Sequence, residues 1–172
     1  MYKYLLYFLI FSFLGWCAEV IFRFIKCGRP INPGLARGPF CPIYGMGICL
    51  SAVLLGDIDS FVLLAVLSMA IATAVELAVG AFCDKILSLR LWDYSSERGN
   101  IFGYVCPRFS LIWGVICASV IKLLPIVDRA LNVLDGAVLK GVAFVILVLV
   151  LVDEKMAMEK PAKNKKRRKM II

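Results

Sequence analysis

The sequence predicts an all-α fold, a polytopic membrane helix bundle of about five spans. Of the 172 residues, 62% are hydrophobic, and a soluble domain of this size has no core large enough to bury them. The mean hydropathy of +0.88 reflects long apolar runs, most of them close to the length that crosses a hydrocarbon layer of ~30 Å. We therefore expect a transmembrane helical domain at residues 1–152 and a basic, disordered cytoplasmic tail at 153–172.

The expected spans cover about residues 4–25, 41–56, 61–83, 101–121 and 131–152. The first span contains the carboxylate of Glu19. A carboxylate inside the bilayer is costly unless it is paired, protonated or faces a polar cavity. Arg23 follows four residues later on the same helix face. Glu19 therefore either belongs to a site for an ion, a proton or a polar ligand, or forms a pair with Arg23 that only fixes helix packing.

The later spans are separated by loops of distinct composition. Pro and Gly residues in the loop at 26–40 forbid a continuous helix between the first span and the short second one. The third span carries a single charged residue, Glu76, and the polar loop at 84–100 separates it from the fourth. The fifth span is the weakest, because Asp135 and Lys140 interrupt its start.

The distribution of basic residues predicts the orientation. With the N-terminus outside, sixteen of the 20 Lys and Arg residues lie on the inner side, eight of them in the tail. Because cytoplasmic segments are enriched in Lys and Arg, we expect an N-terminus outside and a cytoplasmic C-terminus. The tail carries +5 of the net charge of +8, which suits the anionic cytoplasmic lipid surface. Membrane lipids are therefore expected partners and nucleic acid is not, since no folded nucleic-acid-binding module accompanies the basic run.

Cysteine and histidine usage limits the chemistry. Histidine is absent, which excludes imidazole general-base catalysis and histidine metal sites. Four of the seven cysteines lie in apolar runs and three lie near the reducing cytoplasmic face, which argues against a disulfide framework: Cys17, Cys49, Cys83 and Cys117, then Cys27, Cys41 and Cys106. We expect no metal or other cofactor and assign no catalytic residue.

A direct repeat links the two embedded acids. Each copy has an embedded Glu, a loop, a Cys-Pro pair and an aromatic-Gly pair: Glu19, Cys41-Pro42 and Tyr44-Gly45, then Glu76, Cys106-Pro107 and Trp113-Gly114. The separation from Glu to Cys is 22 residues in the first copy and 30 in the second. Two such units side by side would point both acids at one cavity, as in transporters built from parallel repeats. The alternative is coincidence in a cysteine-rich chain.

Polar residues in the loops complete the candidate site. Trp and Tyr in the loop at 84–100 suit the membrane interface, and Asp and Asn also serve as turn residues. Arg108 could pair with Glu76 or Glu19, or extend to the inner surface. The candidate ligand- or ion-binding residues are Glu19, Arg23, Asn32, Tyr44, Glu76, Asp93, Tyr94, Asn100 and Arg108.

Several segments occur together in an order that resembles a known family. They are FSFLGWCAEVIF, NPGLARGPFCPIYGMG, an embedded Glu, LWDYSSERGNIFGYVC and SLIWG. Over about residues 4–121 the chain resembles the bacterial ABC-transporter type IV, or CmpB-like, permease family. The resemblance implies a multi-spanning, permease-like membrane protein without a settled substrate.

Three functions remain open. We favour a transporter permease, or the membrane subunit of a transporter, with a polar site around Glu19 and Glu76. The sequence has no Gly-x4-Gly-Lys-Ser/Thr run, so ATP hydrolysis would need a separate ATPase subunit, and five spans imply a homo- or hetero-oligomer. The alternative is an accessory or scaffold protein whose charges serve helix packing and assembly. A membrane enzyme is least favoured and would use the acids with Cys41 or Cys106 as a nucleophile.

Overall fold

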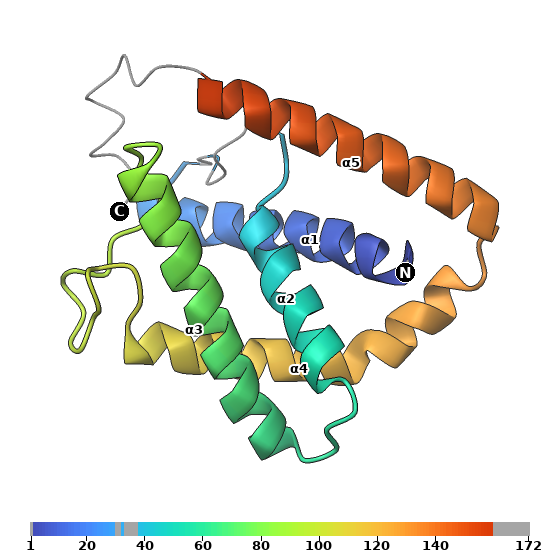
Figure 1. Cartoon of the computed structure of the whole chain (residues 1–172), viewed down its shortest axis with the longest axis horizontal. Helices are drawn as coiled ribbons and strands as arrows, with labels where there is room; N and C mark the ends of the chain where they lie inside the picture. The colour runs from blue at the N-terminus through green and yellow to red at the C-terminus, as the bar shows by residue number, and fades with distance from the viewer. Residues whose placement is uncertain (1, 30–31, 33–37, 160–172) are drawn as a thin grey trace.

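The computed structural model describes residues 2–29, 32 and 38–159 of the chain. Its helices are α1 (Tyr2–Cys27), α2 (Pro42–Leu55), α3 (Phe61–Lys85), α4 (Pro107–Leu131) and α5 (Gly136–Glu159) (Figure 1). Within these ranges the one β-type pairing is an isolated bridge between Ile101 and Val105. The predicted all-α bundle is confirmed.

Four of the helices are long and apolar enough to cross a membrane: Tyr2–Ile25, Phe61–Lys85, Pro107–Leu131 and Gly136–Met158. The helix α2 has 14 residues. At ~1.5 Å per residue it reaches roughly 21 Å, less than the ~30 Å of a hydrocarbon core. The multi-pass architecture therefore rests on four long helices, and α2 is a short fifth helix packed between them.

The fourth helix starts and ends later than expected. It was predicted at 101–121, but α4 begins at Pro107 and continues to Leu131. Before it, Phe102 and Gly103 have positive φ angles of 52° and 71°, which a right-handed helix cannot contain. Lys122 lies one residue beyond the predicted end at 121. Its Nζ donates to the carbonyl oxygen of Ile58 at 2.9 Å, so the charged side chain is hydrogen-bonded and the helix continues past it.

The fifth helix begins with a cap rather than an interruption. The Oδ1 atom of Asp135 accepts hydrogen bonds from the backbone amides of Ala137 at 2.7 Å and Val138 at 3.1 Å. The amides of Val138 and Ala137 lower the pKa of Asp135. The ammonium group of Lys140 lies 4.9 Å from the centre of the Tyr2 ring, so this cation is also accommodated. The helix runs to Glu159 rather than ending at 152, and the predicted tail residues 160–172 lie outside the described part of the chain.

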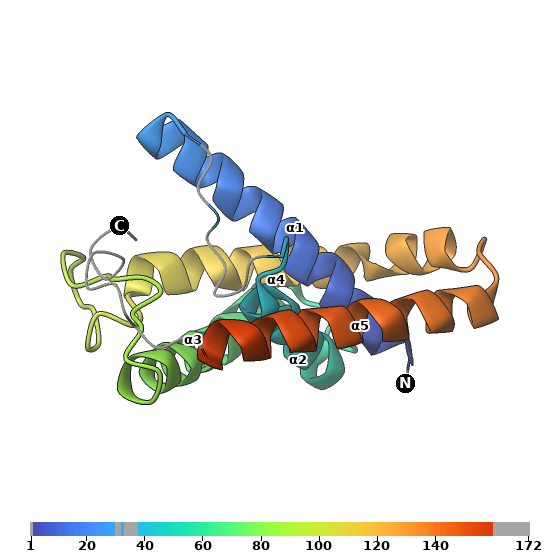
Figure 2. The ribbon, with the colours of Figure 1, turned by 90° about the horizontal axis from the view of Figure 1, so that it is seen from above.

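The helices pack as two pairs, with α5 along one side (Figures 1 and 2). The helix α1 packs on α2 and α3 packs on α4, while α2 also contacts α3 and α4. Among the described helices, α5 contacts α1 alone. One buried cluster joins the first four helices through Tyr7, Ile48, Leu64 and Ala118. The core therefore lies between the two pairs and leaves α5 peripheral.

The two pairs share the same close contact. A Cβ on Gly45 of α2 would meet the hydroxyl oxygen of Ser12 on α1, and a Cβ on Gly114 of α4 would lie 2.6 Å from the Cβ of Met69 on α3. Ser12 and Met69 each precede the embedded acid of their helix by seven residues. This common register supports the predicted direct repeat. Relative to the shared glycine, α4 begins about one turn earlier than α2.

Candidate functional site

The first embedded acid, Glu19 of α1, is held by α2 and by its own helix. The Tyr44 hydroxyl donates to Oε1 of Glu19 at 2.5 Å, and Nε of Arg23 lies 3.6 Å from Oε2. Tyr44 reaches the acid because α1 has a glycine at position 15, where a Cβ would collide with the Tyr44 ring. Glu19 therefore has both a hydrogen-bond donor and a counterion, as its spacing from Arg23 indicates.

The second embedded acid, Glu76 of α3, has hydrogen-bond donors but no cation beside it among the described residues. Its Oε1 atom accepts from Nε1 of Trp113 at 3.1 Å and from the Tyr94 hydroxyl at 3.3 Å. Glu76 is 7% exposed, and its Oε2 atom is buried without a hydrogen-bond partner among the described residues. Arg108, one of its expected partners, instead lies 3.6 Å from Glu97 in the loop before α4. The pairing of Arg108 with Glu76 or Glu19 is therefore not formed, because its 71% exposed side chain extends toward the surface.

An aromatic contact joins the two acids. The rings of Tyr44 and Trp113 meet edge to face, with centroids 5.2 Å apart and planes at 79°. Each ring also carries the donor to one acid, so Glu19, Tyr44, Trp113, Glu76 and Tyr94 form one continuous cluster. We call these five residues the carboxylate–aromatic cluster. It is assembled by α1, α2, α4, α3 and the loop before α4.

The loop between α3 and α4 is folded so that Tyr94 reaches the acid. Its ring stacks on Phe109 of α4, with centroids 4.7 Å apart. Burial and the negative charge of Glu76 raise the pKa of Tyr94, so its hydroxyl stays a hydrogen-bond donor. Nε1 of Trp92 donates to the carbonyl oxygen of Tyr104 at 2.7 Å and closes the loop. This loop is thus an ordered part of the bundle.

Two other candidate residues fold that loop instead of facing the cluster. Oδ1 of Asp93 accepts from the hydroxyl of Ser95 at 2.5 Å and its amide at 2.9 Å, and lies 3.1 Å from Nη2 of Arg90. The Ser95 hydroxyl, the Ser95 amide and the Arg90 charge, in that order, lower the pKa of Asp93. Oδ1 of Asn100 accepts from the amide of Gly103 at 3.0 Å and supports its left-handed conformation. Their role here is local folding.

The structure brings some candidates together and separates others. Asn32 accepts a hydrogen bond from Nε1 of Trp16 on α1 at 3.0 Å. The residues near the two acids are Glu19, Arg23, Tyr44, Glu76 and Tyr94, and those with other contacts are Asn32, Asp93, Asn100 and Arg108. Trp113 was missed as a site residue. The signal for it was available, because Trp113-Gly114 occupies the place of Tyr44-Gly45 in the repeat.

The two thiols proposed for an enzyme are both buried. Cys41 is 7% exposed and Cys106 is 2% exposed, and each precedes the proline that opens a helix. These thiols therefore occupy structural positions at the starts of α2 and α4.

Comparison with known proteins identifies a family. No curated protein matches the chain, and no solved structure matches it. A family model described as "Putative ABC-transporter type IV" matches residues 6–158, which cover all five helices apart from the first four residues of α1 and the last residue of α5. The four long apolar helices agree with a membrane protein of this kind. The chain therefore belongs to this ABC-transporter type IV family and is a multi-pass membrane protein.

Proposed function

We propose that the chain is the membrane-spanning subunit of a transporter and that the carboxylate–aromatic cluster is its polar ligand site. The observation that carries this proposal is Glu76, a buried carboxylate with one unpartnered oxygen and no cation beside it in the described part of the chain. An uncompensated charge at such a place is costly in a low dielectric. A proton or a cation from outside the chain would remove that cost.

The surroundings of Glu76 favour a positively charged ligand. Trp113 and Tyr94 present aromatic rings next to the acid, and ring faces attract cations. Glu19 differs because Arg23 already supplies a counterion at 3.6 Å. In this proposal Glu76 is the acid that gains and loses the positive ligand, and Glu19 holds Tyr44 against Trp113.

The proposal extends to the orientation of the chain in the membrane and to its protein partners. The basic residues favour an extracellular N-terminus and a cytoplasmic C-terminus in a bacterial inner membrane. An ATPase subunit would bind on the cytoplasmic side, where the ordered loop before α4 offers a docking surface. Five helices also favour assembly as a homo- or hetero-oligomer, since a translocation pathway needs more than one such bundle.

One observation favours a second candidate function. Glu19 and Arg23 are close enough to form an ion pair within one helix, which is also what a scaffold protein would use to fix helix packing. In that case the acids act through stability rather than through a ligand. The two functions predict different effects of neutralising the acids.

The experiment compares wild-type protein with Glu76→Gln and a control, Asp57→Asn, which removes an exposed acid between α2 and α3. Each protein is reconstituted in liposomes, and a pH-sensitive dye reports proton release when Na⁺, K⁺ or tetramethylammonium is added. Wild type and the control should release protons with at least one of these cations, and Glu76→Gln should not. Equal release from a folded Glu76→Gln protein would refute the assignment of Glu76.

A second measurement separates the scaffold function. Glu19→Gln and the double variant Glu19→Gln/Arg23→Gln are compared for yield and thermal stability in detergent. The transporter proposal expects both to fold with a similar melting temperature. Loss of stability in the single variant, recovered in the double variant, would favour the scaffold function instead.

A further inference from the structure

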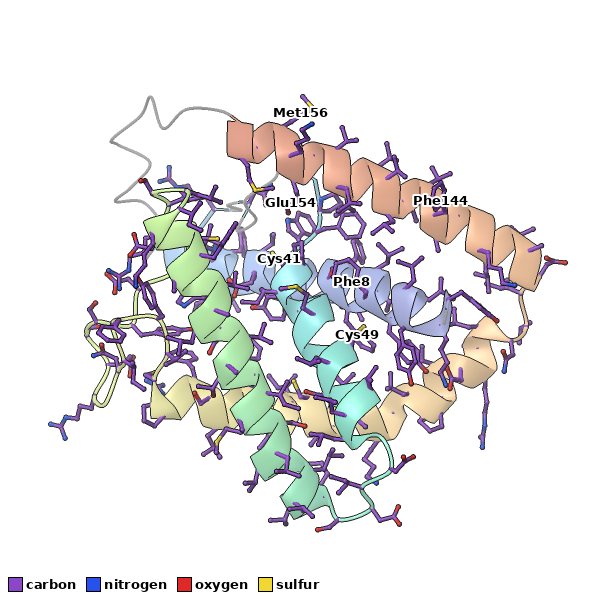
Figure 3. The ribbon with its side chains drawn as sticks, in the orientation of Figure 1. Phe8, Cys41, Cys49, Phe144, Glu154 and Met156 are labelled. Carbon is purple, nitrogen blue, oxygen red and sulfur yellow. The ribbon has the colours of Figure 1, made fainter. Side chains whose placement is uncertain are left out.

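The face of the bundle beside α5 contains an apolar groove away from the carboxylate–aromatic cluster. The groove has a volume of about 500 Å³ and is lined by apolar residues of α1, α2 and α3, among them Phe8, Met46, Leu50, Val53, Val75 and Val79. This volume falls in the range of small-molecule sites, roughly 300–1,000 Å³. The helix α5 runs beside the opening without contacting α2 or α3 (Figure 3).

An unpartnered carboxylate lies on α5, beside the start of α2. Oε1 of Glu154 on α5 is buried and has no hydrogen-bond partner among the described residues. Glu154 interacts electrostatically with the thiols of Cys41 and Cys83, at the start of α2 and near the end of α3. Figure 3 places it between α5 and Cys41. Its neighbour Asp153 is already engaged, because Oδ2 accepts from the amide of Gly38 at 2.6 Å and fixes the end of α5 there.

We infer that this face binds an amphipathic organic cation, with its apolar chain in the groove and its ammonium group against Glu154. The negative charge of Glu154 next to an apolar groove distinguishes between the possible ligands. A plain acyl chain would fill the groove but leave the buried Glu154 oxygen without a partner, which is costly. A hydrophilic cation would meet the acid but leave apolar walls uncovered. A molecule with both parts satisfies both surfaces.

This inference does not depend on the proposed function. Glu154 belongs to α5, which contributes nothing to the carboxylate–aromatic cluster, and the groove is lined by residues outside that cluster. The opening faces the side of the bundle, where lipid would lie, so the ligand would enter from the bilayer. A lipid-soluble cation is concentrated in that phase by its apolar chain.

The test uses the full chain in phosphatidylcholine nanodiscs and two probes, decylammonium (the protonated form of decylamine) and uncharged decanol. Calorimetric titration, with empty nanodiscs subtracted, gives the affinity of each probe. Glu154→Gln removes the charge and keeps the shape. Loss of a hydrogen-bonded charge pair should weaken decylammonium binding by about tenfold or more and leave decanol binding unchanged. Asp57→Asn, an exposed acid outside the groove, is the matched control and should bind both probes like wild type.

A second variant tests the groove itself. Ala78 lines it, so Ala78→Trp should fill it and abolish saturable binding of both probes. Val62→Trp, at a 72% exposed position near the start of the same helix, should bind like wild type. Equal cation affinity in wild type and Glu154→Gln would overturn the inference, as would unchanged binding in Ala78→Trp. Wild-type affinity for decanol matching that for the cation would mean that the groove takes an ordinary acyl chain, which also overturns it.

Discussion

The contact at Gly114 offers a quantitative test of how helix packing sets the carboxylate–aromatic cluster. A Cβ at this position would lie 2.6 Å from the carbonyl oxygen of Ala65 and 2.6 Å from the Cβ of Met69. Heavy atoms in non-bonded contact prefer separations of about 3.5 Å. In Gly114→Ala, α4 must therefore move away from α3 by about 0.9 Å.

This displacement reaches the site through the preceding residue. Nε1 of Trp113 lies 3.1 Å from Oε1 of Glu76. Moving α4 along this direction would stretch the bond to about 4 Å, beyond hydrogen-bond distance. Overpacking costs about 1–3 kcal/mol, and the better helix propensity of Ala returns up to about 1 kcal/mol. We expect the free energy of unfolding to fall by about 1–2 kcal/mol.

The assay is unfolding by sodium dodecyl sulfate in mixed micelles, followed by circular dichroism and by tryptophan fluorescence. Gly47→Ala is the matched control, because a Cβ at Gly47 would meet nothing within 4 Å. It should be as stable as wild type or slightly more stable, with unchanged emission. The reasoning fails if Gly114→Ala unfolds at the same detergent fraction as Gly47→Ala and keeps the wild-type emission spectrum.

Three further predictions concern the two ends of the bundle. Asp128→Asn should raise hydrogen exchange in the first turns of α1, because Asp128 accepts hydrogen bonds from two α1 side chains; exchange like wild type would contradict this. The pKa of Asp93 is lowered, so its stabilising contribution is present above its unfolded value of ~3.9 and is lost as the pH falls through the lower folded value. An acid titration of tryptophan fluorescence should therefore show a step that Asp93→Asn lacks, and identical titrations would count against it. On a cysteine-free background, an impermeant thiol reagent outside the cell should label Asp57→Cys and not Arg98→Cys, whereas the reverse pattern would overturn the proposed orientation.

The helices were predictable where a single run of residues determines whether a helix forms. Apolar runs and prolines at helix starts indicate four long helices and a short one, because both signals lie within the helix that they predict. The start of α4 was not predictable, because the turn before it depends on a positive φ at Phe102, a residue type with no preference for that conformation. Asp135 shows a second limit. The same carboxylate that would interrupt a span in the membrane caps a helix when it stands one position before it.

In the candidate site, contacts within one helix were predictable and contacts between helices were not. The pairing of Glu19 with Arg23 follows from their spacing on one helix, and the structure forms it. The donors to Glu76 come from a loop and from another helix, so they depend on how α3 and α4 are rotated against each other. Arg108 illustrates the difference, since it lies on α4 but points to the loop residue Glu97. The charged residues can be read from the sequence, but which residues they contact on other helices depends on how the helices pack.

The shared register of the two helix pairs also restricts how this protein can evolve. Arg23 and Gly80 each follow the embedded acid of their helix by four residues, so they are equivalent positions. A Cβ on Gly80 would lie 3.3 Å from Cζ2 of Trp92 and 3.3 Å from Cβ of Tyr104, so the volume available to arginine in the first copy is filled by loop aromatics in the second. No single substitution can transfer the arginine between copies. The counterion of the first acid can change within one helix, whereas placing a counterion at the equivalent position beside the second acid requires the helix and its loop to change together.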